Sequence, residues 1–325
     1  MKTKAIRVHE TGGPEVLAYE ETELGEPAAG EALIRHHAIG LNYIDTYHRS
    51  GLYPLPGFPA VIGMEGAGIV EAVGSEVHGL APGDRVAYAA APPGAYAEAR
   101  LIRAESLVKM PESLGFEEAA SIMLQGMTVE YLLNRCYPVK PGQTILLHAA
   151  AGGIGLIACR WAKELGATVI GTVGTDAKAE LARAHGCDHA IVYARENFVE
   201  RVNEITNGQG VPVVYDSVGK DTFLASLDCL DVRGMLVSFG QASGPVPPFD
   251  TSKLALKSLF LTRPSLMAYT AKREELELSA NALFGFIEKG VIDATPRQSY
   301  PLKDAAQAHI DLEGRRTVGS TVLIP

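Results

Sequence analysis

Hydrophobic and polar positions follow two different patterns along the 325-residue chain. Up to about residue 120, short apolar runs alternate with turn-forming stretches such as GGPE, YPLPGFP and APGDRV. Short apolar runs between glycine and proline clusters are typical of strands, so this part is predicted to form a mostly β domain. From about residue 140 the pattern becomes apolar strand, glycine turn and amphipathic helix, repeated.

The second pattern predicts an α/β domain with a doubly wound parallel sheet of about six strands. Strands that are apolar almost throughout and alternate with amphipathic helices belong to a parallel sheet covered on both faces. The strands are expected at 144–150, 167–174 and 189–193, in VPVVYDSV, at 234–240, and in SKLALKSLFLTRP, which should also supply a helix.

The last 60 or so residues return to a helical and turn-rich pattern that ends in STVLIP, and we expect them to pack on the first domain. The predicted division is therefore a mostly β domain made of 1–124 and 265–325, and a doubly wound domain made of 125–264.

Composition narrows the classes of function. The chain is 47% hydrophobic and 21% charged, with a net charge of −9 and no basic cluster, so nucleic acid is an unlikely partner. No apolar stretch reaches signal-peptide or membrane-span length, which predicts a cytoplasmic protein without membrane attachment. The four cysteines have neither disulfide-framework nor metal-site spacing and are interpreted as ordinary core or surface residues: Cys136, Cys159, Cys187 and Cys229.

A glycine loop, HAAAGGIGLIA, joins the first predicted strand of the doubly wound domain to its first helix. In the dinucleotide fingerprint G-x-G-x-x-G, Gly152 and Gly155 match the second and third glycines, with Gly153 and Ile154 between them. The first position is Ala150, which fits only if that turn avoids positive φ. We interpret the loop as a dinucleotide site; the alternative is a tight turn without a ligand.

The end of the second strand, GTVGTDAK, favours NADPH over NADH. An acid there would bind the ribose 2′-hydroxyl, but Gly174 occupies the position. Thr175, Lys178 and Tyr193 offer two hydroxyls and a cation for a 2′-phosphate. Asp176 is the discordant residue and is interpreted as a helix cap. Taken alone, Lys178 is better interpreted as a solvated surface lysine.

The segment GMEGAGIVEAVGSEVHGLAPGDRV (63–86) resembles the G-H-E-x-x-G…G-D-R-V segment of the medium-chain dehydrogenase/reductase superfamily. In zinc members of that superfamily the histidine before the glutamate binds the metal, and Met64 stands there instead. Asn42 stands where a cysteine ligand would be, and 90–110 lacks the four-cysteine lobe. A thioether holds zinc poorly, so no zinc is expected in the superfamily's manner.

The whole chain resembles the zinc-free, NADPH-dependent quinone oxidoreductases, which include zeta-crystallin, through NYIDTYHRSGLYP, VVYDSVG, LTRPSL and YPLKDAAQAH. This resemblance implies a GroES-like substrate domain, a Rossmann domain and a homodimer. It implies nicotinamide-side contacts from Asn42 and Thr128, pyrophosphate contacts from Gly152 to Gly155, 2′-phosphate contacts from Gly174, Lys178 and Tyr193, and further cofactor contacts from Ser217, Phe239, Gly240 and Arg315. The role of Gln125 stays open.

A quinone is electron-poor, so its reduction by hydride or electrons from NADPH needs placement and water exclusion more than a metal. Asn42 is predicted to orient the nicotinamide side, with Tyr47 and Tyr53 as walls of the substrate pocket. Arg49 either contacts a substrate carbonyl or pairs with Asp45, and His148 is interpreted as a packed residue. No general acid is identified.

Two other functions remain compatible with the sequence. One is the NADPH-dependent reduction of α,β-unsaturated carbonyls or enoyl thioesters, since an enone resembles half a quinone. The other is a structural or RNA-binding role for an NADPH-binding protein, against which the acidic charge balance argues.

Overall fold

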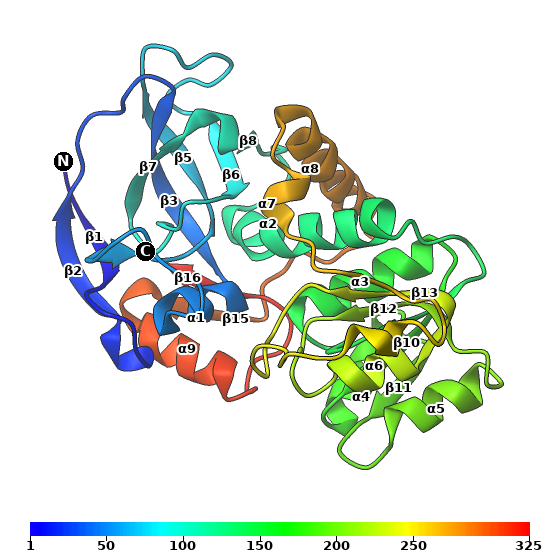
Figure 1. Cartoon of the computed structure of the whole chain (residues 1–325). Helices are drawn as coiled ribbons and strands as arrows, with labels where there is room; N and C mark the ends of the chain where they lie inside the picture. Colours follow the sequence, from blue (N-terminus) through cyan, green and yellow to red (C-terminus); the bar gives the residue numbers. More distant parts are fainter. The chain divides into compact units, whose positions relative to one another are not determined.

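The computed structural model describes residues 1–325, which divide into two compact units (Figure 1). The N-terminal unit contains Met1–Met127, Thr270–Gly285 and Ala294–Pro325, and the central unit contains Thr128–Tyr269 and Phe286–Asp293. In Figure 1 the blue start and the red end of the chain both belong to the N-terminal unit.

The N-terminal unit is built on two sheets, as its alternating apolar runs predict. Its larger sheet has the order β15-β16-β3-β5-β6-β8 with β7 also paired to β3, and the smaller has the order β2-β1-β4. The strands are β1 (Lys2–Val8), β2 (Ala18–Glu23), β3 (Glu31–Leu41), β4 (Ala60–Val61), β5 (Glu65–Val73), β6 (Arg85–Ala89), β7 (Ala99–Arg103), β8 (Val108–Lys109), β15 (Gln298–Pro301) and β16 (Thr321–Ile324). The C-terminal strand β16 pairs antiparallel with β3, so the end of the chain belongs to this sheet.

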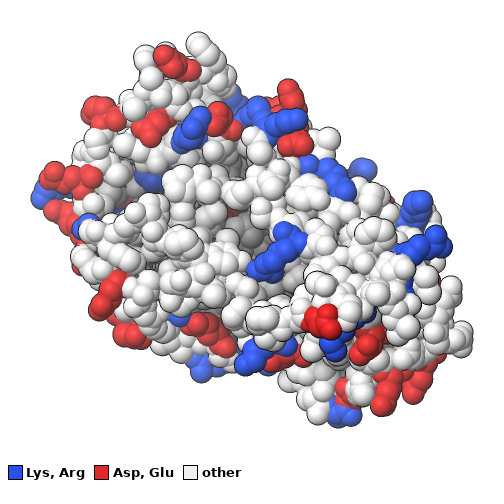
Figure 2. All heavy atoms as spheres, in the orientation of Figure 1, with Lys and Arg blue, Asp and Glu red and all other residues white.

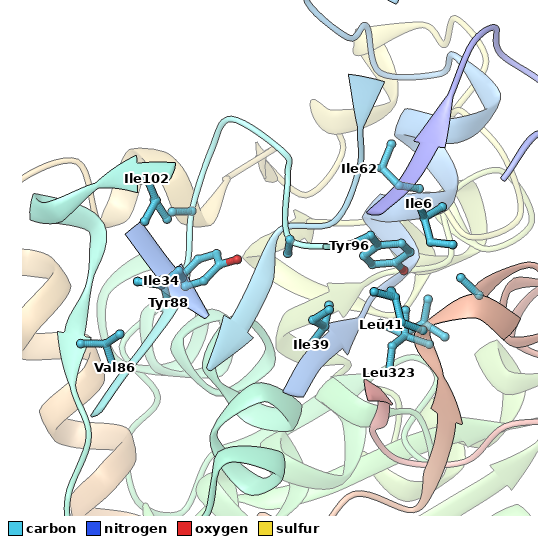
Figure 3. Packing of buried hydrophobic residues seen from close by; sticks show 14 of the residues in the cluster. Ile6, Ile34, Ile39, Leu41, Ile62, Val86, Tyr88, Tyr96, Ile102 and Leu323 are labelled. Carbon is cyan, nitrogen blue, oxygen red and sulfur yellow. The ribbon is translucent and has the colours of Figure 1, made fainter. Parts of the chain in front are cut away.

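A hydrophobic core cluster lies in this unit (Figure 3). Ile34, Ile39 and Leu41 come from β3, and Leu323 of the C-terminal strand packs in the same cluster. Two tyrosines, Tyr88 and Tyr96, are fully buried there, so their hydroxyls need partners inside the protein. The helices that begin in this unit are α1 (Tyr43–Ser50), α2 (Phe116–Tyr131), α8 (Arg273–Glu288) and α9 (Ala305–Glu313), with 3₁₀ turns η1 (Pro14–Val16), η2 (Ala104–Ser106) and η5 (Leu302–Asp304).

The central unit is the predicted six-stranded parallel sheet, with the order β11-β10-β9-β12-β13-β14. Its strands are β9 (Thr144–Leu147), β10 (Thr168–Val173), β11 (His189–Val192), β12 (Val211–Asp216), β13 (Leu230–Ser238) and β14 (Phe260–Thr262). Its helices are α3 (Gly153–Glu164), α4 (Asp176–Ala184), α5 (Phe198–Ile205), α6 (Phe223–Asp228) and α7 (Leu266–Tyr269), together with the π-helix η3 (Leu132–Cys136) and the 3₁₀ turn η4 (Thr251–Leu254). The strand order reverses between β9 and β12, which in such sheets opens a ligand crevice at the carboxyl ends.

Three element boundaries differ from the predictions. The helix expected in SKLALKSLFLTRP is only the 3₁₀ turn η4, and Ser258 beyond it has a φ of 52°, which a helix cannot continue through. The first strand ends at Leu147 because the chain turns at Ala149, with a φ of 54°. Strand β13 begins at Leu230, before the predicted start.

No helix combines the length and the apolar character needed to cross a membrane. On the face shown in Figure 2, acidic and basic side chains are interspersed, and no continuous basic surface of the kind that attracts nucleic acid is present on that face.

Candidate active site

The glycine loop lies between β9 and α3 in the central unit. Gly152 caps the helix in an extended conformation, with a φ of −77°, and Gly153, Ile154 and Gly155 form its first turn. A Cβ at Gly155 would overlap the Ala149 carbonyl oxygen and lie 2.7 Å from the Cα of Ala150, so only glycine fits. Ala150 is not among the residues with positive φ, which meets the condition set for an alanine there; its neighbour Ala149 takes that conformation instead. The unpaired N–H groups at this helix start suit an anion.

Beyond β10 the residues predicted to bind a 2′-phosphate come together. A Cβ at Gly174 would lie 2.9 Å from the Tyr193 hydroxyl, so these two positions adjoin. Thr175 is the N-cap of α4, and its hydroxyl accepts a hydrogen bond from the Lys178 backbone N–H at 3.3 Å. Asp176 is therefore not the cap; it forms a 2.7 Å ion pair with Arg195, which lowers the pKa of this exposed carboxyl and offsets its charge.

Three further predicted cofactor residues of the central unit, Ser217, Phe239 and Gly240, lie at the carboxyl ends of β12 and β13. The Phe239 N–H donates to the Asp216 carbonyl at 2.9 Å, and a Cβ at Gly240 would lie 2.6 Å from the Ser217 carbonyl oxygen. Thr128, in α2, is buried with 5% of its surface exposed. In the N-terminal unit, Arg315 lies exposed just beyond α9, in a left-handed conformation with a φ of 57°.

His148 is a packed residue, as predicted. It is 1% exposed, and its ring nitrogens lie 2.8 Å from the Thr172 hydroxyl and 2.9 Å from the Ser226 hydroxyl. Burial lowers the pKa of its imidazole, which favours the neutral ring.

Helix α1 in the N-terminal unit and the turn after it carry the aromatic side chains predicted to bind substrate. The rings of Tyr47 and Tyr53 meet edge to face, with centroids 5.2 Å apart, and Tyr43 lies 6.1 Å from Tyr47. The Tyr53 N–H donates to the Tyr47 carbonyl at 3.0 Å, which fixes the turn after the helix. Tyr47 and Tyr53 therefore lie together, and Asn42 is the N-cap of the same helix.

Arg49 does not pair with Asp45, and it is not a substrate contact in this structure. It is 3% exposed and donates two 2.9 Å bonds to the Glu313 carboxylate. It also donates to His309 at 2.9 Å, and His309 contacts the Tyr96 hydroxyl at 3.0 Å. Tyr96 donates to the Asp45 carboxyl at 3.0 Å, so these residues join α1 to α9.

Burial strongly shifts the pKa values of two side chains in this α1–α9 network, His309 and Asp45. Burial lowers the pKa of His309 to about 3, with the nearby Arg49 charge acting in the same direction. Burial raises the pKa of Asp45 to about 7, although the Asn42 N–H and the Tyr96 hydroxyl that it accepts favour its ionised form. No local sequence pattern could predict this network, because its members lie far apart along the chain.

Met64 and Glu65 lie in the segment that resembles the one from which zinc members of the superfamily supply a metal ligand. Met64 is 3% exposed and packs in the interior, and Asn42 is 5% exposed. Neither a thioether nor an amide is a ligand that zinc prefers, so this donor set does not fit a catalytic zinc ion. No group of three or more histidine, cysteine, aspartate or glutamate side chains in residues 1–325 could hold a metal. All four cysteines are free thiols, and Cys159, Cys187 and Cys229 are buried.

Glu65 is fully buried, and the Asn42 amide donates to its carboxyl at 2.6 Å. The Gln125 amide in turn donates to the Asn42 oxygen at 3.3 Å. The sequence predicted a role for Asn42 but not its contacts with Glu65 and Gln125. The only sequence signal was that Glu65 lies in the segment that resembles the superfamily motif.

Comparison with known proteins shows the family. The alcohol dehydrogenase GroES-like domain matches residues 28–133, and the zinc-binding dehydrogenase domain matches residues 153–281. The chain is 54% identical over 323 residues to a quinone oxidoreductase of Pseudomonas aeruginosa, covering 99% of each protein. It is 46% identical to a 2-haloacrylate reductase of Burkholderia sp., covering 99% of this chain and 98% of that protein.

A solved structure of Escherichia coli quinone oxidoreductase complexed with NADPH superposes with a TM-score of 0.97 at 51% identity, over 99% of this chain and 100% of the other. The aligned region includes both units. The chain is therefore an oxidoreductase and belongs to the quinone oxidoreductase family of the medium-chain dehydrogenase/reductase superfamily.

Proposed function

We propose that this protein reduces quinones with NADPH and without a metal. The observation that carries the proposal is 51% identity over 99% of the chain to the quinone oxidoreductase solved with NADPH. NADPH, when bound, supplies a hydride or electrons from its nicotinamide ring. The chain's own residues need only hold the two reactants and exclude water.

The central unit is proposed to hold the cofactor. Gly152 to Gly155 bring backbone N–H groups to the pyrophosphate at the start of α3, where the helix dipole favours negative charge. Gly174, Thr175, Lys178 and Tyr193 surround the proposed 2′-phosphate position, and the ion pair of Asp176 with Arg195 reduces the repulsion that a free carboxylate would exert there. Thr128, Ser217, Phe239 and Gly240 complete the proposed contacts from this unit.

The N-terminal unit is proposed to receive the quinone, with one further cofactor contact from Arg315. Tyr47 and Tyr53 offer flat apolar rings against which a quinone ring can pack. Asn42 offers an amide to the nicotinamide side. Solvent or one of the tyrosine hydroxyls would protonate the product, because no exposed acid lies among these residues.

A direct assay tests this function. Purified protein with EDTA present is offered NADPH with 1,4-benzoquinone, and separately NADPH with 2-chloroacrylate or a cyclohexenone. Turnover of the quinone that chelator leaves unchanged is the expected result. No oxidation of NADPH by any quinone, at protein concentrations that bind NADPH, refutes the proposal.

A second function follows from a specific likeness. The 2-haloacrylate reductase is 46% identical over nearly the whole chain, and its structure superposes with a TM-score of 0.88. Reduction of an activated alkene requires a proton at the α-carbon as well as a hydride. Preference for 2-chloroacrylate in the same assay would therefore assign this reaction and make a tyrosine proton donor the next residue to find.

We also propose that the protein is a cytoplasmic homodimer. Strand β14 is at the edge of the central sheet and exposes Phe260 at 56% and Leu261 at 38%, while Leu256 just before it is 91% exposed. An apolar edge strand is suited to pairing with a second copy. Light scattering should give about twice the monomer mass, and Phe260→Lys should shift it towards the monomer.

The unpaired thiols suit a reducing compartment, which cell fractionation can test.

A further inference from the structure

Four polar side chains form a continuous series of hydrogen bonds in the N-terminal unit: Glu65, Asn42, Gln125 and Ser320, here called the amide network. The Ser320 hydroxyl donates to the Gln125 oxygen at 3.0 Å, and the Gln125 nitrogen donates to the Asn42 oxygen at 3.3 Å. The Asn42 nitrogen donates to Glu65 Oε2 at 2.6 Å. Every bond therefore runs in one direction, towards the carboxylate.

The surroundings of Glu65 require this direction when its carboxyl group is ionised. Its Oε1 accepts the Leu124 backbone N–H at 2.7 Å, so donors approach both carboxyl oxygens. A Cβ at Gly40 would overlap the carboxyl group and the Ala120 carbonyl oxygen, so glycine there makes the space that Glu65 occupies. A carboxylate can only accept, and hence each amide in the series must present its nitrogen towards Glu65 and its oxygen away.

We propose that Glu65 is a positioning residue, which in its ionised form fixes the orientation of the Asn42 amide for the bound nicotinamide or quinone, with Gln125 and Ser320 completing the alignment. This proposal rests on the proposed function. It gives Gln125 a role, and it explains a buried acid beside a methionine at a site without zinc ligands.

A proton on Glu65 would reverse the whole series. Glu65 would then donate to the Asn42 oxygen, the Asn42 nitrogen to Gln125, and the Gln125 nitrogen to Ser320. The donor and acceptor that Asn42 offers to a ligand would exchange places. Burial raises the pKa of Glu65 to about 8, and the charged or titratable groups that act on it electrostatically are Asp45, Tyr88 and Tyr96. The ionised orientation should therefore become more populated as the pH rises towards 9.

The decisive test exchanges the acid and the amide. In Glu65→Gln the new nitrogen should face Asn42 and invert its amide. In the double variant Glu65→Gln/Gln125→Glu the carboxylate lies at the other side of Asn42, every hydrogen bond can be made, and the Asn42 amide is inverted. At pH 9, where Glu65 of wild type is mostly ionised, we expect kcat/KM for benzoquinone to be about 10-fold or more lower in both variants. The rise in kcat/KM towards pH 9 that we expect of wild type should be absent from Glu65→Gln.

A purely structural role predicts a different result. The double variant restores the full set of bonds, so it should then recover both its melting temperature and its activity. Recovery of kcat/KM to within about 3-fold of wild type overturns the proposal, and so does an unchanged pH profile in Glu65→Gln. If Glu65→Gln does not fold, Ser320→Ala and the double variant carry the test, and wild-type kinetics in both would also overturn it.

A matched control and a separate binding measurement complete the design. Glu130→Gln neutralises another buried carboxyl, 1% exposed and paired with Arg135, and should leave kcat/KM and its pH profile within about 2-fold of wild type. If wild type binds NADPH but reduces no quinone, the proposed function fails by itself. The network is then judged by NADPH affinity, which should weaken in both inverted variants and is equal to wild type if the proposal is wrong.

Discussion

The contacts proposed for the central unit and those proposed for the N-terminal unit come from different kinds of group. In the central unit the predicted cofactor contacts lie at the backbone of the β9–α3 turn and at the carboxyl ends of neighbouring strands. In the N-terminal unit they depend on side chains, with Asn42 held between Glu65 and Gln125. Binding by backbone groups is lost when a side chain occupies the space that the ligand needs. Binding by side chains depends instead on which of their hydrogen-bond partners are ionised.

The largest expected effect tests the backbone site. Gly155→Val places a branched side chain against the Ala149 carbonyl and the Ala150 backbone, which cannot move without distorting the β9–α3 turn. We expect NADPH affinity to fall by about 100-fold or more, measured by the fluorescence of the bound nicotinamide. Gly285→Ala is the control, because a Cβ there meets no atom within 4 Å and its helix should become slightly more stable. Normal NADPH affinity in a folded Gly155→Val protein would contradict a role for this turn in binding.

The difference between backbone and side-chain contacts also explains which parts of the fold and of the site could be predicted from the sequence. The six parallel strands and the glycine loop are local patterns, in which residues close along the chain determine strand, turn and helix, and these predictions are confirmed. The boundary errors at Leu147 and Ser258 arise where single residues take left-handed conformations that hydrophobicity does not encode.

The side-chain site is different, because its contacts join residues distant in sequence. Arg49 was predicted to meet a substrate or Asp45, but its partner is Glu313, separated from it by 264 positions. Gln125 and Ser320 are 195 positions apart. Only the folded sheet, in which β16 pairs with β3, brings such residues together, so no local pattern could have predicted them.

The next effect concerns the stability of the N-terminal unit at different pH values. The pKa values of Asp45 and Glu65 in the folded protein, about 7 and about 8, lie above those of the unfolded chain, so the folded state holds these protons more tightly. Their contribution to stability is therefore lost as the pH rises. Between pH 6.5 and 8 the free energy of unfolding should fall by about 2 kcal/mol, measured by urea unfolding.

Two histidines act in the opposite direction at lower pH. Burial lowers the pKa of His36 and of His309 to about 3, below the unfolded value near 6.5, so the folded state must lose stability as the pH falls from about 6.5 towards 3.

Asp45→Asn removes one of the two acids and should make the decline above pH 6.5 shallower. A decline that is unchanged in this variant would show that Asp45 titrates normally in the folded protein.

A smaller effect is expected at the ribose end of the cofactor site. Lys178→Ala should raise the KM for NADPH by about 10-fold, about 1.4 kcal/mol, because a charge-assisted contact to the 2′-phosphate is lost. The KM for NADH should not change. Lys163→Ala, which removes an exposed lysine paired with Asp188, is the control and should alter neither value. An equal rise for NADH and NADPH would show that Lys178 does not recognise the phosphate.

The smallest effect is expected where the N-terminal unit has a side-chain network that we do not assign to binding. Glu313→Gln weakens the partner of Arg49, but the Glu313 side chain is 38% exposed and Arg49 keeps its bonds to His309 and to the Gly12 carbonyl oxygen. We expect a loss of about 1 kcal/mol in the free energy of unfolding, because a partly solvated ion pair contributes little and the remaining donors stay paired. Calorimetric melting measures this loss, and quinone kinetics should stay within about 2-fold of wild type. A large fall in kcat with little loss of stability would instead mean that the α1–α9 network helps to place Tyr47 and Tyr53, and that side-chain control of the substrate site extends beyond the amide network.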